Sequence, residues 1–254
     1  KFLATWAIIF SVAGSLLAYT IIGSEFIHQA LLPWFDLSPE IASIIFWLIL
    51  SYFIFRGIHL IARMELLMVL ALFTTVGLII IYAWPHLDPV NFQALGDLRL
   101  LGPYGVILFA LTGWSAIPEI ADLFKTKKDR GRLDNIIVWA SVLTLGLYLA
   151  FTLMVVGVSG LLTSEDALTG LVDHLGPKVV SLGALFGLLA VAASFLVLGN
   201  YLKNSLRYDF NFSYLFSASV ATLIPLTFYL FGVRSFIAVI DIVGVVSLGA
   251  IEGV

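Results

Sequence analysis

Long runs of apolar residues, separated by short polar connections, dominate the chain. Because a membrane-spanning helix needs about 20 consecutive apolar residues, the pattern predicts eight spans. They lie at roughly 3–23, 40–58, 64–84, 103–123, 134–160, 178–202, 212–231 and 235–252. No soluble domain, low-complexity tract or clear sequence repeat accompanies them. We therefore expect an all-α integral membrane protein, with residues 1–254 forming a single transmembrane domain.

The overall composition agrees with this interpretation. Hydrophobic residues make up 61% of the chain and charged residues only 11%, which is far outside the composition of a soluble globular domain. The chain contains no cysteine, which excludes a disulfide framework and a thiolate metal site. Nothing in the composition favours binding to nucleic acid.

Basic residues occupy every second connection between the predicted spans. They are Arg56 and Arg63 after the second span, Lys125, Lys127, Lys128, Arg130 and Arg132 after the fourth, and Lys203 and Arg207 after the sixth. The intervening connections are acidic and poor in Lys and Arg, and only the short one at Arg234 departs from the alternation. Since Lys and Arg concentrate on the cytoplasmic side, we expect the N-terminus inside the cell.

The fourth predicted span contains residues that disrupt a helix. Its sequence LFALTGWSAIPEI includes Gly113 and Pro118. Within hydrocarbon a proline frees a backbone carbonyl that another group has to satisfy, and glycine lowers helix propensity further. We expect an unwound centre at which Thr112, Ser115 and free backbone groups face a cavity and offer partial charges to a small zwitterion or an ion. A simple proline kink, with Gly113 as a close packing contact, is the alternative.

Glu119 directly follows this proline. An ionisable group within a span costs about 2.5–3.5 kcal/mol at the bilayer centre, so it is a candidate functional residue by default. The alternative is that Glu119 reaches the interface near Asp122 and Lys125. An intramembrane enzyme is not expected, because the sequence has no H-E-x-x-H motif, and Glu119 and Asp241 are predicted at different depths.

The segment TGWSAIPEI resembles the discontinuous sixth helix of amino-acid permeases of the APC superfamily, in particular the branch of aromatic and hydroxy amino-acid permeases. The segments LLAYTIIGSEF, RMELLMVLALF, KTKKDRGR and LGNYLKNSLR follow the order of that family. On this resemblance residues 1–85 correspond to helices three to five, and residues 103–252 to helices six to ten, of a LeuT-like inverted-repeat bundle with one discontinuous helix. Helices one and two of the family are missing.

The resemblance implies secondary active transport, as a symporter of the plasma membrane. The substrate would be a small neutral or aromatic amino acid, moved by alternating access. In the family the broken first helix supplies half of the substrate and ion contacts. A non-transporting or partner-dependent membrane subunit, or a truncated pseudo-transporter, therefore stays open as the alternative.

The resemblance also implies where the substrate binds. Its candidate contacts are Tyr19 in the first span and Thr112, Gly113, Trp114, Ser115 and Ala116 at the break. Trp114 would cover the bound side chain as a gate, with core packing as the alternative. Tyr19 would line the site as the aromatic residue of helix three, with an interfacial or packing role as the alternative.

Glu119 and Asp241 are the candidates for gating or proton coupling. The resemblance places Asp241 at an outer gate, with Arg234 or a residue of the missing helices as its partner. A structural pair with a polar residue of another span is the alternative.

The coupling ion is left open between H⁺ and Na⁺, and no cofactor is expected. Ser194 is the single hydroxyl where sodium-coupled members of the family place helix-eight hydroxyls, and a back-bond to its own helix is the alternative. The span at 64–84 lacks the lysine that some proton-coupled members carry. The histidines are too scattered for a metal site, so we expect none; they are His28, His59, His86 and His174.

Overall fold

The computed structural model describes residues 2–31, 34–56, 61–92, 103–111 and 127–252. These residues form α-helices joined by short 3₁₀ helices and loops, without a β-strand among them. The α-helices are α1 (Phe2–Leu31), α2 (Pro39–Arg56), α3 (Ile61–Ala83), α4 (Tyr104–Leu111), α6 (Lys127–Ser159), α7 (Val172–Leu175), α8 (Pro177–Tyr208), α9 (Tyr214–Leu230) and α10 (Phe236–Glu252). The 3₁₀ helices are η1 (Trp84–His86), η2 (Pro89–Phe92), η4 (Gly160–Leu162) and η5 (Thr169–Leu171).

The predicted apolar spans coincide with these helices, and the all-α membrane fold is confirmed. Four stretches of the described chain are long and apolar enough to cross a membrane: Trp6–Leu31, Pro39–Arg56, Leu133–Leu162 and Pro177–Tyr208. Three shorter apolar helices accompany them. Helix α4 covers the beginning of the predicted fourth span. The rest of that span lies outside the described residues.

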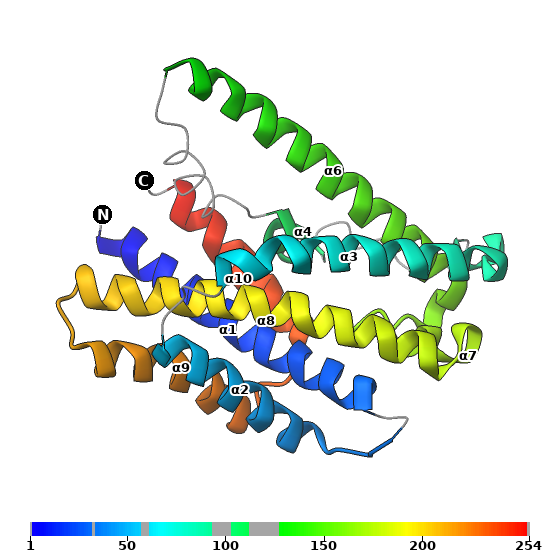
Figure 1. The fold of residues 1–254 in the computed structure, drawn as a ribbon, viewed down its shortest axis with the longest axis horizontal. Coiled ribbons are helices and arrows are strands. Elements are labelled where there is room, and N and C mark those ends of the chain that lie inside the picture. The colour runs from blue at the N-terminus through cyan, green and yellow to red at the C-terminus, as the bar shows by residue number, and fades with distance from the viewer. Residues whose placement is uncertain (1, 32–33, 57–60, 93–102, 112–126, 253–254) are drawn as a thin grey trace.

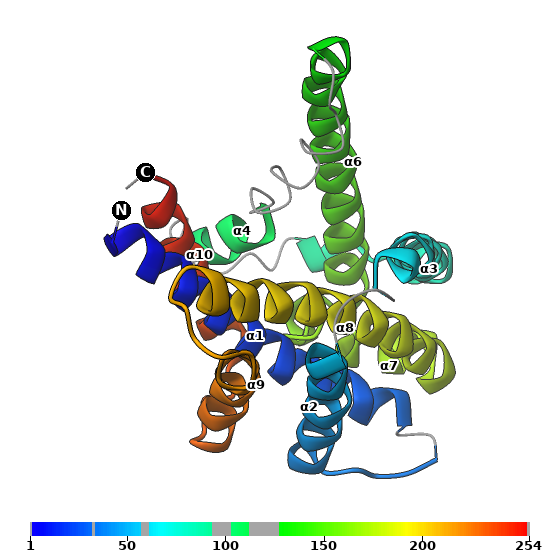
Figure 2. The ribbon, with the colours of Figure 1, turned by 60° about the vertical axis from the view of Figure 1, so that its left-hand side comes forward.

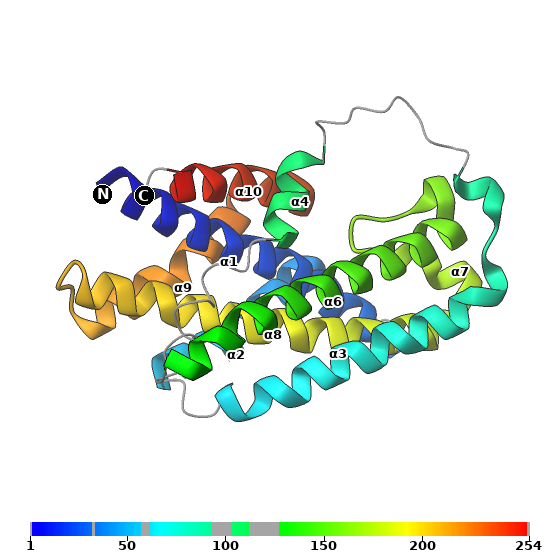
Figure 3. The same cartoon turned by 90° about the horizontal axis from the view of Figure 1, so that it is seen from above.

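Helices α1 and α8 form the centre of the bundle. Figure 1 shows them crossing, with α2 and α9 on one side and α3 on the other. Helices α10 and α4 pack against each other next to α1, as Figure 3 shows from above. Helix α6 leans away from the bundle (Figure 2) and contacts it mainly near its C-terminal end, where Met154, Val155 and Val158 are buried. The earlier turns of α6 present apolar residues on the outside, as a helix in lipid does.

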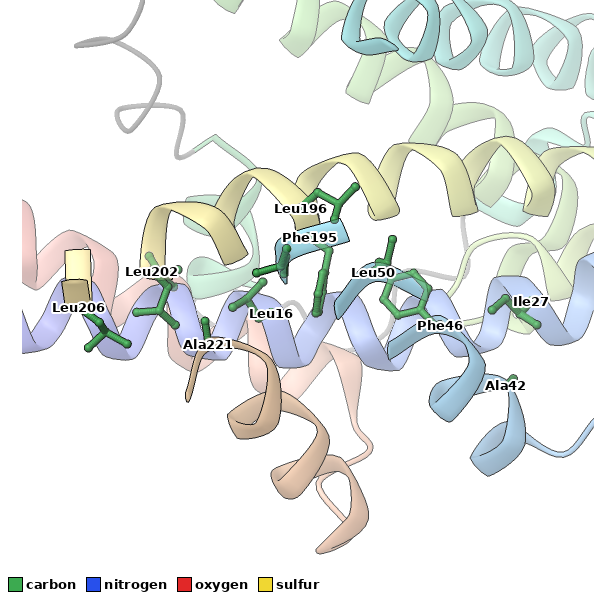
Figure 4. Packing of buried hydrophobic residues seen from close by; sticks show 12 residues of the cluster. Leu16, Ile27, Ala42, Phe46, Leu50, Phe195, Leu196, Leu202, Leu206 and Ala221 are labelled. Carbon is green, nitrogen blue, oxygen red and sulfur yellow. The ribbon is translucent and has the colours of Figure 1, made fainter. Parts of the chain in front are cut away.

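A close-packed core holds α1, α2, α8 and α9 together. Leu16, Phe46 and Phe195 come from three different helices, are at most 2% exposed, and point toward one another (Figure 4). The Phe46 and Phe195 rings meet edge to face with centroids 5.5 Å apart, a favoured geometry for aromatic pairs. A Cβ atom at Gly23 of α1 would lie 2.6 Å from the Phe46 ring, so this glycine permits the close approach of α2.

The connections rich in acidic residues lie at one end of the bundle. In Figure 1 the start of α2, η1, η2 and α7 are at the right, whereas the start of α1, the end of α10 and the α8–α9 connection are at the left. At the right-hand end, Gln29 of α1 donates hydrogen bonds to Asp166 and, over 2.6 Å, to the Thr169 hydroxyl. Ser181 of α8 donates to the Ala30 carbonyl over 2.8 Å. At this end of the bundle, the loop after α6 is thus tied to α1, and α8 is tied to α1.

Candidate functional site

The candidate site begins at Tyr19, a partly buried residue near the middle of α1. Its ring faces Phe109 of α4, with centroids 6.4 Å apart and planes inclined by 59°. Its hydroxyl interacts with the side chain of Ser194 on α8. Ser194 also donates to the Ala190 carbonyl of its own helix over 3.1 Å, which leaves its oxygen lone pairs available to the tyrosine hydroxyl. The fold therefore brings together two residues that the sequence analysis selected separately.

A second tyrosine joins this group from α6. Tyr148 is 41% exposed, and its hydroxyl donates to the Ala110 carbonyl of α4 over 3.2 Å. Tyr148 also lies near Tyr19. Tyr19, Phe109 and Tyr148 thus converge from three helices on the last described turn of α4, immediately before the predicted break.

Two glycines set the position of α4 against α10. At Gly105 of α4 the backbone lies against the carbonyl group and the Oδ1 atom of Asp241, leaving no room for a Cβ atom. At Gly244 of α10 an added Cβ atom would lie 3.0 Å from the backbone nitrogen of Phe109. Small residues of this kind allow two helix backbones to touch in a membrane. The crossing with α10 therefore determines how far Phe109 stands from Tyr19.

Asp241 lies at this crossing and is partly exposed. Its suggested partner Arg234 instead forms an ion pair with Glu40 of α2, with 2.7 Å between the Arg234 Nη1 and Glu40 Oε1 atoms. The carboxylate of Asp241 therefore faces α4 rather than this arginine.

The other selected residues lie outside the described part of the chain. They are Thr112, Gly113, Trp114, Ser115, Ala116 and Glu119. Their contribution to the site stays a prediction, as does the unwinding around Pro118.

An open cavity of about 300 Å³ lies at the acidic end of the bundle. Its lining includes Ile21 and Ile22, which follow Tyr19 by two and three residues and so lie about 3–5 Å further along the helix axis. The polar part of the lining consists of Glu25, Ser164, Glu165, Asp166, Thr169 and Arg234. Carboxylates and a guanidinium group on one cavity match both charges of a zwitterion.

The sequence analysis missed Phe109 and Tyr148. Phe109 lies one turn before Gly113, so its distance from the predicted break could have suggested it. Tyr148 is a tyrosine inside an apolar span, as Tyr19 is, but Tyr19 was selected through the family resemblance. Neither signal indicates that both residues lie at the end of α4 near Tyr19.

The model of one protein family, the tryptophan/tyrosine permease family, matches residues 1–251 of the chain. Comparisons with curated proteins and with solved structures gave no match. The family match extends over nearly the whole chain and includes every helix that contributes to the aromatic group described above.

Proposed function

The chain belongs to the tryptophan/tyrosine permease family, and we propose that it carries an aromatic amino acid by alternating access around the centre of the bundle. Members of a permease family transport amino acids across the membrane and are not enzymes, so both expectations from the sequence are confirmed at this level. The LeuT-like repeat arrangement, the plasma membrane location and symport with H⁺ or Na⁺ belong to the proposal.

The observation that carries the proposal is the convergence of Tyr19, Phe109 and Tyr148 beside the predicted break. Aromatic rings recognise another ring through offset or edge-to-face contacts, and a tyrosine hydroxyl adds a hydrogen bond for a polar ring substituent. The side chain of the substrate would lie against this group. Its ammonium and carboxylate groups would lie against the backbone around Thr112 and Ala116, where the ends of the predicted broken helix would offer partial charges.

The cavity at the acidic end suits the approach of the substrate from outside the cell. Glu25 and Glu165 would favour the ammonium group, and Arg234, which also pairs with Glu40, would favour the carboxylate group. Asp241 would act as a gating residue because it faces α4 at the Gly105 contact, so a change of its charge acts directly on that helix. Glu119 would take part in proton coupling, and Ser194 would contribute to an ion site through its contact with Tyr19.

Uptake by proteoliposomes tests the proposal. We expect the full chain to accumulate labelled tyrosine or tryptophan, and Phe109→Ala to raise KM for both by about tenfold, which corresponds to about 1.4 kcal/mol. Uptake of leucine should change less, because leucine has no ring to lose a contact. Phe228→Ala is the matched control, since Phe228 is 51% exposed on α9. If Phe109→Ala raised KM equally for aromatic and aliphatic substrates, the assignment of Tyr19, Phe109 and Tyr148 to aromatic recognition would be refuted.

A further inference from the structure

Two histidines far apart in the sequence meet at the acidic end of the bundle. His86 ends η1, directly after α3, and His174 lies in α7; Figure 1 shows both elements at the right-hand end. The ring centroids are 6.5 Å apart and the ring planes are inclined by 65°. Both side chains are exposed. Although the four histidines are scattered in the sequence, the fold brings this pair together.

The hydrogen bonding of His86 leaves one ring nitrogen free to bind a metal. Its Nδ1 atom lies 3.2 Å from the carbonyl oxygen of Tyr82. A carbonyl oxygen only accepts, so Nδ1 carries the proton, and in the neutral ring the Nε2 atom has a free lone pair. Histidines that bind metals commonly donate their other N–H to a backbone carbonyl, which fixes the tautomer and the orientation of the ring. His86 has this arrangement on the surface of the protein.

The separation of the rings also suits a shared ion. With Zn–N distances of about 2.0–2.1 Å, two imidazoles on one tetrahedral ion have their centroids about 5–6 Å apart. The His86 and His174 centroids are 6.5 Å apart, and small rotations of these two exposed side chains would bring them to that distance.

We propose that His86 and His174 bind one transition-metal ion, with water in the remaining coordination positions. Within the described residues no three His, Cys, Asp or Glu side chains form a candidate metal group, so the protein supplies two ligands. Imidazole ligands select Zn²⁺, Ni²⁺ or Cu²⁺ over Mg²⁺ and Ca²⁺, which prefer oxygen. The ion links the outer end of α3 to α7, immediately before α8 begins at Pro177. In the predicted orientation, the ion binds from outside the cell. The site is independent of the proposed transport cycle.

Titration of the purified full chain with Zn²⁺ tests the site. We expect one saturable Zn²⁺ site per chain by isothermal titration calorimetry, and a rise in the unfolding temperature that EDTA reverses. His86→Ala and His174→Ala should each weaken Zn²⁺ binding by at least about tenfold. Loss of a residue that only supports a metal ligand already weakens binding by about this factor, and here the ligand itself is lost. The double variant should show no saturable Zn²⁺ binding, because it has lost both imidazole ligands. Mg²⁺ should have no effect.

His28→Gln is the matched control. The Nδ1 atom of His28 contacts the Leu37 carbonyl at 2.7 Å, so this histidine has a comparable backbone contact without the second ring. This variant should retain wild-type Zn²⁺ affinity. X-ray absorption at the zinc edge of the wild-type protein, which depends on no substitution, should show two imidazole nitrogens. Absence of saturable Zn²⁺ binding, a first shell without imidazole, or binding that persists in the double variant would overturn the proposal.

Discussion

Replacing Gly105 by alanine probes the contact that positions α4. The added Cβ atom would lie 2.8 Å from the carbonyl carbon of Asp241, with the oxygen of the same group closer still. These atoms include the backbone of α10 and not merely the end of a flexible side chain, so a helix has to shift. The shift moves Phe109 relative to Tyr19, and substrate recognition should suffer together with stability.

The size of the effect follows from two opposing contributions. Overpacking in a close-packed contact costs about 1–3 kcal/mol, whereas alanine is favoured over glycine inside a helix by about 0.5–1 kcal/mol. We expect a net loss of about 1–2 kcal/mol in the free energy of unfolding. For a chain of this size the unfolding temperature should fall by about 2–8 °C. Thermal unfolding of the detergent-solubilised protein measures this change, and tyrosine uptake measures the effect on recognition.

Gly146→Ala on α6 is the matched control, because an added Cβ atom there meets nothing within 4 Å. It should leave the unfolding temperature unchanged or raise it, and uptake should stay at the wild-type level. If Gly105→Ala unfolds at the same temperature as Gly146→Ala or above it, α4 and α10 do not touch at this glycine. The account of how Phe109 is positioned would then be wrong.

Three further substitutions test the contacts between helices. Gln29→Leu removes the donor to the buried Asp166 carboxylate and should cost about 1.5–3 kcal/mol, measured as faster proteolysis in the connection after α6. A double-mutant cycle of Arg234→Gln with Glu40→Gln should give a coupling energy of only about 0–1 kcal/mol, because the two side chains are 49% and 45% exposed. A larger coupling energy would contradict this expectation. Trp47→Phe loses the indole hydrogen bond of 2.8 Å to a backbone carbonyl of α9 and should lower the free energy of unfolding by about 0.5–1.5 kcal/mol, seen as a lower unfolding temperature.

The sequence was sufficient to locate the helices and to indicate the class of protein. Each apolar run predicts its own span, because the free energy of placing a segment in lipid depends mainly on that segment's own side chains. Helices α9 and α10 accordingly begin and end within a few residues of the predicted boundaries. Tyr19, Ser194 and Asp241 could be selected one at a time, because each is a polar group within an apolar span and the family resemblance gave each a role.

The partners of those residues were decided only by the tertiary structure. The Tyr19–Phe109 contact, the Tyr148 hydrogen bond to Ala110 and the His86–His174 pair each join segments far apart in the chain. Such pairs depend on how helix surfaces fit together, and periodicity along one helix carries no information about the shape of another. For the same reason the sequence left the partner of Asp241 open between Arg234 and a residue of the missing helices. In the structure, α2 packs against α9 and Arg234 pairs with Glu40. Hydropathy is a local property of each segment, but a binding site is a property of the contacts between segments.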